Sequence, residues 1–272
     1  MRTPSFAPIR VAVALVAFAA VTSSCSSDGG SALAPLAAVD DSLLAAVAVD
    51  PALSAEPAQA TLPGLVADNQ NTFSATVAPA QVCTWTPTVG RIICTPIVRD
   101  GLTYSRSVGY YDAKGIAQPK RDSLTRSMNT RITVKGTTTT KRGPLVVDRA
   151  SSLTVSGLGK GAVTHTMDGS EAGTSVGTFV VNNVNVTSAE SFSSVTASVV
   201  VPAEGKTKWP LSGTTTRTST QTVTRAGGAT RTSASSESVT FNGTQVVPMT
   251  LTRDGKTRAC TKDLGTGKLS CV

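Results

Sequence analysis

Turn signals spaced at strand length are the feature that most restricts how this 272-residue chain can fold. Strong turn dipeptides stand at Asp100-Gly101, Asp168-Gly169, Asn242-Gly243 and Asp254-Gly255. Asp-Gly and Asn-Gly favour hairpin turns, because these residues take positive φ at little steric cost. The segments Asp112 to Gly115 and Ala226 to Gly228 add two further turns. No helical pattern of ordinary length stands between these signals, so we expect hairpins.

The intervals between the turns alternate apolar and polar residues with the period of a strand. Residues 102–110, 131–135 and 153–155 all show this alternation, which is typical of antiparallel sheet with one apolar and one wet face. The segment Val195 to Val201 is nearly continuous in Val and Ala, and we expect it to be buried on both faces. The segment Leu211 to Phe241 is rich in Thr and predicts one long, mostly solvated hairpin about Gly227-Gly228.

Composition supports a β protein over a helical one. Only 4% of the residues are aromatic and 15% are charged, while about a quarter are Ser or Thr. β-Branched residues suit a pleated surface and lose rotamer freedom in a helix. We therefore predict an all-β fold, in which an antiparallel β-meander of about ten to twelve strands forms a curved sheet, an open half-barrel or a sandwich after a flexible N-terminal tether.

Two cysteine pairs repeat one spacing and one local sequence. Cys83 and Cys94 enclose ten residues, as do Cys260 and Cys271, and both segments fit the pattern C-T-x5-G-[R/K]-[I/L]-x-C. Directly opposed residues of antiparallel strands lie within the Cα separation that a disulfide accepts. We therefore predict a disulfide-closed hairpin near each end of the body. The alternative is a bridge between the two ends, as between Cys83 and Cys271.

Even loops are expected inside the two hairpins. The first loop is predicted over Pro87 to Gly90, and the second over either Gly265-Thr266 or Leu264 to Gly267. Each short closed loop contributes about 3 kcal/mol in the chain-entropy treatment. A metal site is not expected from these cysteines, because their wide spacing lacks the close pairs of zinc sites.

The N-terminal residues have the features of an export signal. Arg2 and Arg10 precede the apolar run Val11 to Val21, which is shorter than the roughly 20 residues that span a bilayer. The following residues, Val21-Thr22-Ser23-Ser24-Cys25, resemble the lipobox of bacterial lipoproteins, although Thr22 stands where that motif usually has Leu. The resemblance implies cleavage after residue 24 and acylation of Cys25. The alternative is a plainly secreted protein with Cys25 as an ordinary thiol.

Cysteine parity agrees with lipidation. The chain has five Cys, and an odd thiol in an exported protein is expected to be modified or paired. Acylation of Cys25 leaves the four that form two pairs. Ser26 is not the Asp that retains lipoproteins in the inner membrane, so the resemblance implies an outer-membrane lipoprotein of the cell envelope, facing the periplasm or the surface.

Charge divides the chain into two unlike parts. Residues 11–90 have six Asp or Glu and no Lys or Arg, whereas residues 91–272 have 23 Lys+Arg against 11 Asp+Glu and so carry +12. We predict three segments, which are a signal peptide over residues 1–24, an acidic lipidated tether over 25–68 and a Thr-rich β domain over 69–272. Residues 40–49 either form a short helix that docks on the body or belong to a flexible spacer.

The sequence offers no catalytic constellation. Its one His is His165, with no acid pair or nucleophile motif near it, and we expect a structural or surface role for this side chain. We therefore expect no enzyme and no cofactor. Nucleic acid is not an expected partner either, since stacking aromatics do not accompany the basic residues and export removes the usual target.

Two hypotheses of function remain. In the first, the body is an interaction or structural module of the envelope, whose Lys/Arg-bearing strands bind an anionic component. The cations considered are Arg131, Lys135, Lys141, Arg217, Arg225 and Arg231. These could instead be a solvated face that prevents edge aggregation. In the second, the body is a carrier with an apolar cavity, lined by Trp85, Tyr104, Tyr110, Phe192 and Trp209.

Overall fold

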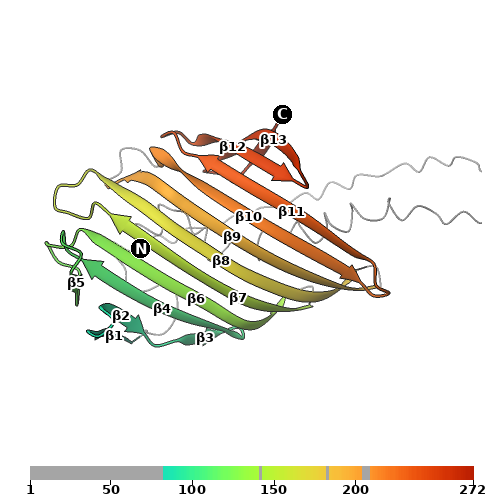
Figure 1. The fold of residues 1–272 in the computed structure, drawn as a ribbon, viewed down its shortest axis with the longest axis horizontal. Coiled ribbons are helices and arrows are strands. Elements are labelled where there is room, and N and C mark those ends of the chain that lie inside the picture. Colours follow the sequence, from blue (N-terminus) through green and yellow to red (C-terminus); the bar gives the residue numbers. More distant parts are fainter. Residues whose placement is uncertain (1–81, 141–142, 182–183, 204–208) are drawn as a thin grey trace, which may run out of the picture. The chain divides into compact units, whose positions relative to one another are not determined.

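A computed structural model describes residues 82–140, 143–181, 184–203 and 209–272. Its strands form one antiparallel sheet of 14 strands (Figure 1), and the described residues contain no helix. The strands are β1 (Cys83–Thr86), β2 (Arg91–Cys94), β3 (Ile97–Arg99), β4 (Leu102–Tyr111), β5 (Ala117–Gln118), β6 (Ser127–Thr140), β7 (Gly143–Ser156), β8 (Thr164–Val181), β9 (Val184–Pro202), β10 (Ser212–Arg225), β11 (Thr230–Thr240), β12 (Val246–Arg253), β13 (Lys256–Asp263) and β14 (Leu269–Cys271).

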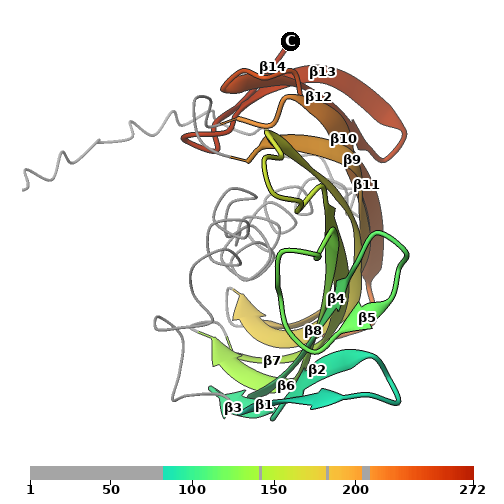
Figure 2. The same cartoon turned by 90° about the vertical axis from the view of Figure 1, so that its left-hand side faces the viewer.

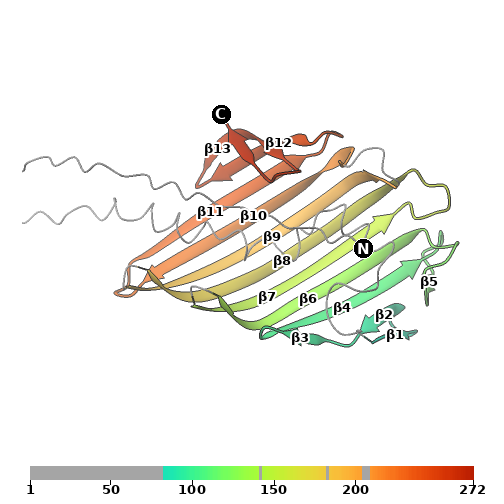
Figure 3. The same ribbon diagram turned by 180° about the vertical axis from the view of Figure 1, so that it is seen from behind.

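The strands follow the chain as a meander. Their order in the sheet is the order in the sequence, except that β3 and β5 both pair with β4 off the main path. Figure 2 shows the sheet curled into an open half-barrel, and Figure 3 shows the long strands β6 to β11 side by side from behind. The all-β prediction is confirmed. The predicted count of ten to twelve strands is too low. The strands β3, β5 and β14 have only three, two and three residues, which is too short to show an alternation of apolar and polar residues.

Most predicted turns join consecutive strands. Asp100-Gly101 and Asp254-Gly255 connect two strand pairs, and all four residues have positive φ, between 48° and 79°. That backbone matches the right-handed twist of the flanking strands. Asp168-Gly169 is different, and the prediction of a turn there is wrong. It lies inside β8 at a register shift.

The register shift is a bulge in β9, where two residues lie opposite Asp168 of β8, and a side-chain hydrogen bond spans it. The carboxylate Oδ1 of Asp168 accepts the backbone N–H of Ser198 on β9 at 2.8 Å, and Ser198 has φ 49°. A bulge leaves one residue outside the ladder, and here the Asp side chain replaces the missing ladder partner. The Asp-Gly pair therefore continues β8 opposite a bulge in β9 and does not reverse the chain.

The expectation that Val195 to Val201 is buried on both faces is also wrong. Val195 is 53% exposed, whereas Val199 is completely buried. All strands of the described chain belong to one sheet, so no second sheet covers the outward side chains. The run of Val reflects strand propensity and not two-sided burial.

The long Thr-rich hairpin is confirmed. β10 and β11 pair from Thr214 with Thr240 to Thr224 with Thr230, and the turn lies at Gly227 and Gly228 (φ 104° and 98°). Cross-strand hydroxyls face each other along it, as in Thr222 Oγ1 to Thr232 Oγ1 at 3.1 Å. Such pairs satisfy polar groups on a face exposed to water.

Both disulfides form as predicted, one at each edge of the sheet. Cys83 bonds to Cys94 with Cα atoms 3.9 Å apart, and Cys260 bonds to Cys271 with Cα atoms 4.0 Å apart. The first hairpin loop is Pro87 to Gly90, since Thr86 pairs with Arg91. In the second hairpin the N–H of Asp263 donates to the carbonyl of Lys268 at 2.9 Å, which leaves Leu264 to Gly267 as the loop.

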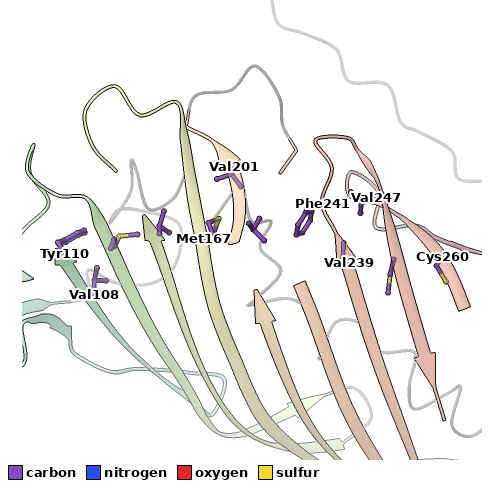
Figure 4. Packing of buried hydrophobic residues seen from close by; sticks show 12 residues of the cluster. Val108, Tyr110, Met167, Val201, Val239, Phe241, Val247 and Cys260 are labelled. Atoms are coloured by element: carbon purple, nitrogen blue, oxygen red, sulfur yellow. The ribbon is translucent and has the colours of Figure 1, made fainter. Parts of the chain in front are cut away.

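Many of the buried apolar side chains of the described strands belong to two clusters on one face of the sheet. The larger, which we call cluster 1, is shown in Figure 4; its members are Val108, Tyr110, Met128, Val155, Met167, Val199, Val201, Val239, Phe241, Val247, Met249 and Cys260. Cluster 2 comprises Leu145, Val147 and Phe179, with Leu102 packed against it. The half-cystine Cys260 is part of cluster 1, so the C-terminal disulfide also anchors the core.

Candidate functional site

Strand register assigns every strand residue to one of two faces. Directly paired residues share a face, and one row of pairs runs from Val108 on β4 through Leu153 on β7 and Thr196 on β9 to Val239 on β11. We call the face of this row the core face and the opposite one the outer face. We assign the core face to the concave side, because side chains converge there and shield one another from water.

The cations of the sheet lie mainly on the core face. By register, ten of the Lys and Arg residues in the described strands lie there, against three on the outer face, Arg91, Arg131 and Lys135. The ten are Arg99, Arg106, Arg149, Arg217, Arg225, Arg231, Arg253, Lys256, Arg258 and Lys262. Three acids accompany them, Glu171, Glu190 and Glu237. The core face of these strands is therefore strongly basic.

A belt of charged side chains crosses the middle of this face. The guanidinium carbon of Arg149 lies 5.0 Å from the ring centroid of Phe192, and that of Arg217 lies 4.4 Å from it. Cations above an aromatic ring are attracted by its quadrupole, more strongly where water is excluded. Arg217 Nη2 also lies 3.4 Å from the carboxylate Oε1 of Glu190. We call Arg149, Glu171, Glu190, Phe192 and Arg217 the charged belt.

A glycine on β8 makes the belt possible. Gly173 pairs with Arg149 on one side and with Phe192 on the other. A Cβ at this position would lie 2.8 Å from Cγ of Arg149 and 3.0 Å from Cε1 of Phe192. Real Cβ atoms do not approach carbon so closely, so only Gly lets both side chains fold over this strand.

Burial changes the proton affinities of the belt. Arg149 is 8% exposed, and burial lowers its pKa, while the neighbouring Glu171 opposes the shift. Burial raises the pKa of Glu171, and the attraction of Arg149 and Arg217 does not cancel that effect. Both shifts have the sign of a charge removed from water. The belt itself has two Arg and two Glu side chains, whose mutual attraction water screens only weakly.

Apolar surface flanks the belt along the strands. On β8, Met167 of cluster 1 precedes Glu171 and Gly173, and Phe179 of cluster 2 follows them. On β7, Leu145 and Val147 of cluster 2 come directly before Arg149. Along these strands, the core face therefore has an apolar region, then the charged belt, then a second apolar region.

Among the described strands, the outer face has mostly Ser and Thr, and its buried cation Arg91 has a structural role. Arg91 is 4% exposed, and its guanidinium donates to Ser107 Oγ at 3.1 Å, to Asn129 Oδ1 at 2.8 Å and to the Asn129 carbonyl at 3.1 Å. Burial lowers its pKa, and Arg131 lowers it further. These bonds join β2, β4 and β6. Arg91 therefore stabilises the N-terminal edge of the sheet and is not available to a ligand.

The cations singled out from the sequence do not share one face. Arg217, Arg225 and Arg231 lie on the core face, whereas Arg131 and Lys135 lie on the outer face. Lys135 pairs there with Asp148 at 3.0 Å. Lys141 lies outside the described residues. A single solvated basic face is therefore wrong, since Arg217 is only 20% exposed in its side chain.

The five aromatic residues proposed to line a cavity do not gather around one point. Trp85, Tyr104, Tyr110 and Phe192 all lie on the core face by register. Tyr110 belongs to cluster 1, whereas Phe192 lies between the two guanidiniums of the belt. Trp209 is half-buried before β10.

His165 is a structural residue of the core face. It is 5% exposed, and its Nδ1 lies 3.0 Å from the carbonyl oxygen of Gly157. Across the described ranges, no group of three or more His, Cys, Asp or Glu could hold a metal ion. In the same ranges no helix is long and apolar enough to cross a membrane. Cys25, the signal segment, the tether and the short helix proposed at 40–49 lie outside the described residues.

Of the ten core-face cations, only Arg217, Arg225 and Arg231 were singled out from the sequence; Arg149, the other cations and the acids Glu171 and Glu190 were not. A signal for Arg149 was available, since it stands two residues after Val147 and four after Leu145 and so shares their face at the strand period. Comparison with known proteins adds no further assignment, because no family model, no curated protein and no solved structure matches the chain.

Proposed function

We propose that the protein is a lipid-anchored interaction module of the cell envelope, whose core face binds an anionic envelope component such as lipopolysaccharide, a wall polymer or an acidic protein surface. One observation carries this proposal. Ten cations and three acids occupy the core face of the described strands. Five of the ten cations are exposed, but at a buried position such as Arg149 a face built only for stability would have an apolar side chain.

The arrangement of the cations suits an extended anion. Arg149 and Arg217 are held by Phe192, and more exposed cations such as Arg253 and Arg258 continue the basic surface towards the C-terminal edge. Guanidinium groups bind carboxylate and phosphate through two parallel N–H donors. A partner with anionic groups repeated along its length would meet several of them at once.

The anchor is the second half of the proposal. Acylation of Cys25, the first residue after the signal segment, would attach the body to the outer membrane through the tether. Nothing in this proposal requires catalysis or a cofactor. Labelling of cells with a fatty-acid probe tests it, because the wild type should be labelled and Cys25→Ser should not. Equal labelling of the two proteins would contradict the anchor.

Binding through the core face is testable with a matched pair of variants. Arg253→Gln/Arg258→Gln removes two exposed core-face charges, and Arg131→Gln/Lys135→Gln removes two from the outer face. The assay is sedimentation of the protein with phosphatidylglycerol vesicles in 0.1 M salt. Each cation near an anionic surface contributes about 1 kcal/mol, so the core-face variant should bind roughly thirtyfold more weakly. The outer-face variant should bind nearly as the wild type does.

Salt and lipid charge provide the controls. Binding should weaken as added salt shortens the Debye length from roughly 10 Å at 0.1 M to 3 Å at 1 M. Phosphatidylcholine vesicles should not bind. An equal loss in both variants would mean that net charge and not the core face attracts the anion, and binding that ignores salt would contradict the proposal.

A carrier of an amphiphile is the second candidate, and the flanking clusters favour it. Cluster 1 and cluster 2 lie on either side of the charged belt, a pattern that would fit a molecule with an anionic group between apolar parts. Gentle mass spectrometry of the purified protein separates the two candidates. A stoichiometric amphiphile that is lost on Arg217→Gln would establish the carrier, whereas its absence together with vesicle binding would favour the interaction module.

A further inference from the structure

The core face lacks a second sheet to pack against it. All strands of the described chain belong to one sheet, and that sheet has two apolar clusters separated by basic residues. A segment that covered this face would need apolar side chains for the clusters and carboxylates for the cations. It would also need to lack cations of its own.

Residues 40–68 have this composition. They include Asp40, Asp41, Asp50, Glu56 and Asp68, with no Lys or Arg. Between these acids stand apolar residues, which are Leu43, Leu44, Val47, Val49, Leu53, Leu62, Leu65 and Val66. The five carboxylates could offset five of the seven excess positive charges on the core face, and the apolar residues could cover its clusters.

The segment is joined to the sheet at a suitable place. Fourteen residues separate Asp68 from Cys83, and fully extended they would reach about 45 Å. β1 begins at Cys83, which by register shares the core face with Trp85. The chain therefore enters the sheet on a strand whose side chains include core-face residues, within reach of the belt.

We propose that residues 40–68 bind the core face of the sheet, with their carboxylates on its cations and their apolar residues on its clusters. The segment then competes with any anionic partner for the same cations. This competition rests on the proposed function, whereas the docking of the segment does not. Because the segment is covalently attached, its local concentration is high, and a partner would have to displace it.

Zero-length cross-linking of the full chain without its signal segment tests the docking. For this test Cys25→Ser is the background, since it removes the lipid and leaves both native disulfides. A carbodiimide joins carboxylates to lysine amines in contact with them. We expect monomeric products in which residues 40–68 are joined to Lys256 and Lys262 on the core face. The ion pair between Lys135 and Asp148, at 3.0 Å, supplies an internal positive control on the outer face.

A second variant separates docking from attraction by net charge. Leu43→Ser/Leu44→Ser/Val47→Ser keeps every carboxylate and every lysine, but removes apolar contacts. We expect it to lose at least fivefold in the cross-links to Lys256 and Lys262, with the Lys135–Asp148 product unchanged. Cross-links from residues 40–68 that reach Lys135 as often as Lys256 and Lys262 would overturn the proposal. Cross-links unaffected by the serine substitutions would also overturn it.

Vesicle binding by the same two proteins distinguishes this inference from the proposed function. If the segment competes, the serine variant should bind phosphatidylglycerol vesicles at least fivefold more tightly than its parent, although the two have the same charge. Specific cross-links without vesicle binding by either protein would support docking and contradict the proposed function. Vesicle binding that depends on Arg253 and Arg258, without cross-links to Lys256 or Lys262, would support the function and contradict docking.

Discussion

Replacement of Phe192 by Leu is the most direct test of the charged belt. Phe192 is 5% exposed and lies between Arg149 and Arg217, with ring-centroid distances of 5.0 and 4.4 Å. Phe179 is an appropriate reference, because it is 7% exposed on the same face and packs with Leu145 and Val147 in cluster 2. Both Phe→Leu changes remove similar apolar volume, and only the first removes contacts with cations.

The magnitude follows from the burial of the two guanidiniums. A cation–π contact contributes about 0.5–1 kcal/mol at exposed sites and about 2 kcal/mol where it is desolvated. Arg149 is 8% exposed, and the side chain of Arg217 is 20% exposed, so about 1 kcal/mol for each is a conservative value. Phe192→Leu should therefore lower the free energy of unfolding by about 2 kcal/mol more than Phe179→Leu does.

Urea denaturation at neutral pH measures this difference, provided that the slope of the transition is unchanged. A difference of 2 kcal/mol is a factor of about thirty in the unfolding equilibrium constant. Arg217→Met is then made in the wild type and in Phe192→Leu. This double-mutant cycle gives the coupling energy between Arg217 and Phe192, for which we expect about 1 kcal/mol. If the two Phe→Leu variants differed by less than about 0.5 kcal/mol, Phe192 would be an ordinary core residue and the belt would have no energetic basis.

Three further outcomes are expected. Gly173→Ala should lower the free energy of unfolding by about 1–3 kcal/mol, because its Cβ would lie 2.8 Å from both Cγ of Arg149 and the carbonyl oxygen of Asp148; chemical denaturation measures this. Loss of the C-terminal disulfide in Cys260→Ser/Cys271→Ser should cost about 3 kcal/mol, and hydrogen exchange should show β13 and β14 opening first. Glu171→Gln should raise the free energy of unfolding at pH 7, and the gain should disappear as pH falls below the ordinary carboxyl pKa.

The sign for Glu171 follows from linkage. Burial raises the pKa of this carboxyl in the folded protein, so the folded state holds the proton more tightly than the unfolded chain does. Stability then decreases as pH rises from the ordinary pKa through the raised one, and Gln avoids this loss. A gain from Gln that persisted at low pH would contradict the reasoning. The control for Gly173→Ala is Ala172→Val on the outer face, which should change the free energy of unfolding by less than about 0.5 kcal/mol.

The antiparallel hairpins were predictable from the sequence, because their signals are local. A disulfide between opposed residues needs a fixed even spacing, and the repeated C-T-x5-G pattern supplied it for both hairpins. The turn at Asp254-Gly255 depends on two residues that accept positive φ. Asp168-Gly169 shows the limit of this reasoning. The same dipeptide continues β8 there, opposite a bulge in β9, and the Asp carboxylate accepts the N–H of Ser198 from that bulge.

The composition of the core face was harder to predict, since it depends on register across many strands. Arg131 alternates with Ile132 and Val134, which places it on the outer face, but Arg217 stands in a Thr-rich segment with few apolar neighbours. Only the pairing of β9 to β11 shows that Arg217 lies on the core face. Charge also misled the prediction, because cations were expected to point to water. In this sheet the outer face has mostly Ser and Thr, which pair with one another across strands, together with exposed Val residues such as Val146, Val176 and Val195.

The placement of Arg149 and Glu171 bears on function as well as on stability. Removing charges from water costs free energy that an apolar pair of the same size would not cost. Local rules that a sequence breaks in a fold that otherwise obeys them are expected at sites under functional selection. Here charged side chains stand on the core face, where apolar ones are expected. They lie next to Gly173, which makes room for them, and between cluster 1 and cluster 2. The buried charges on this face are therefore the part of the molecule that stability alone does not explain, and their excess of cations is the reason why we propose an anionic partner.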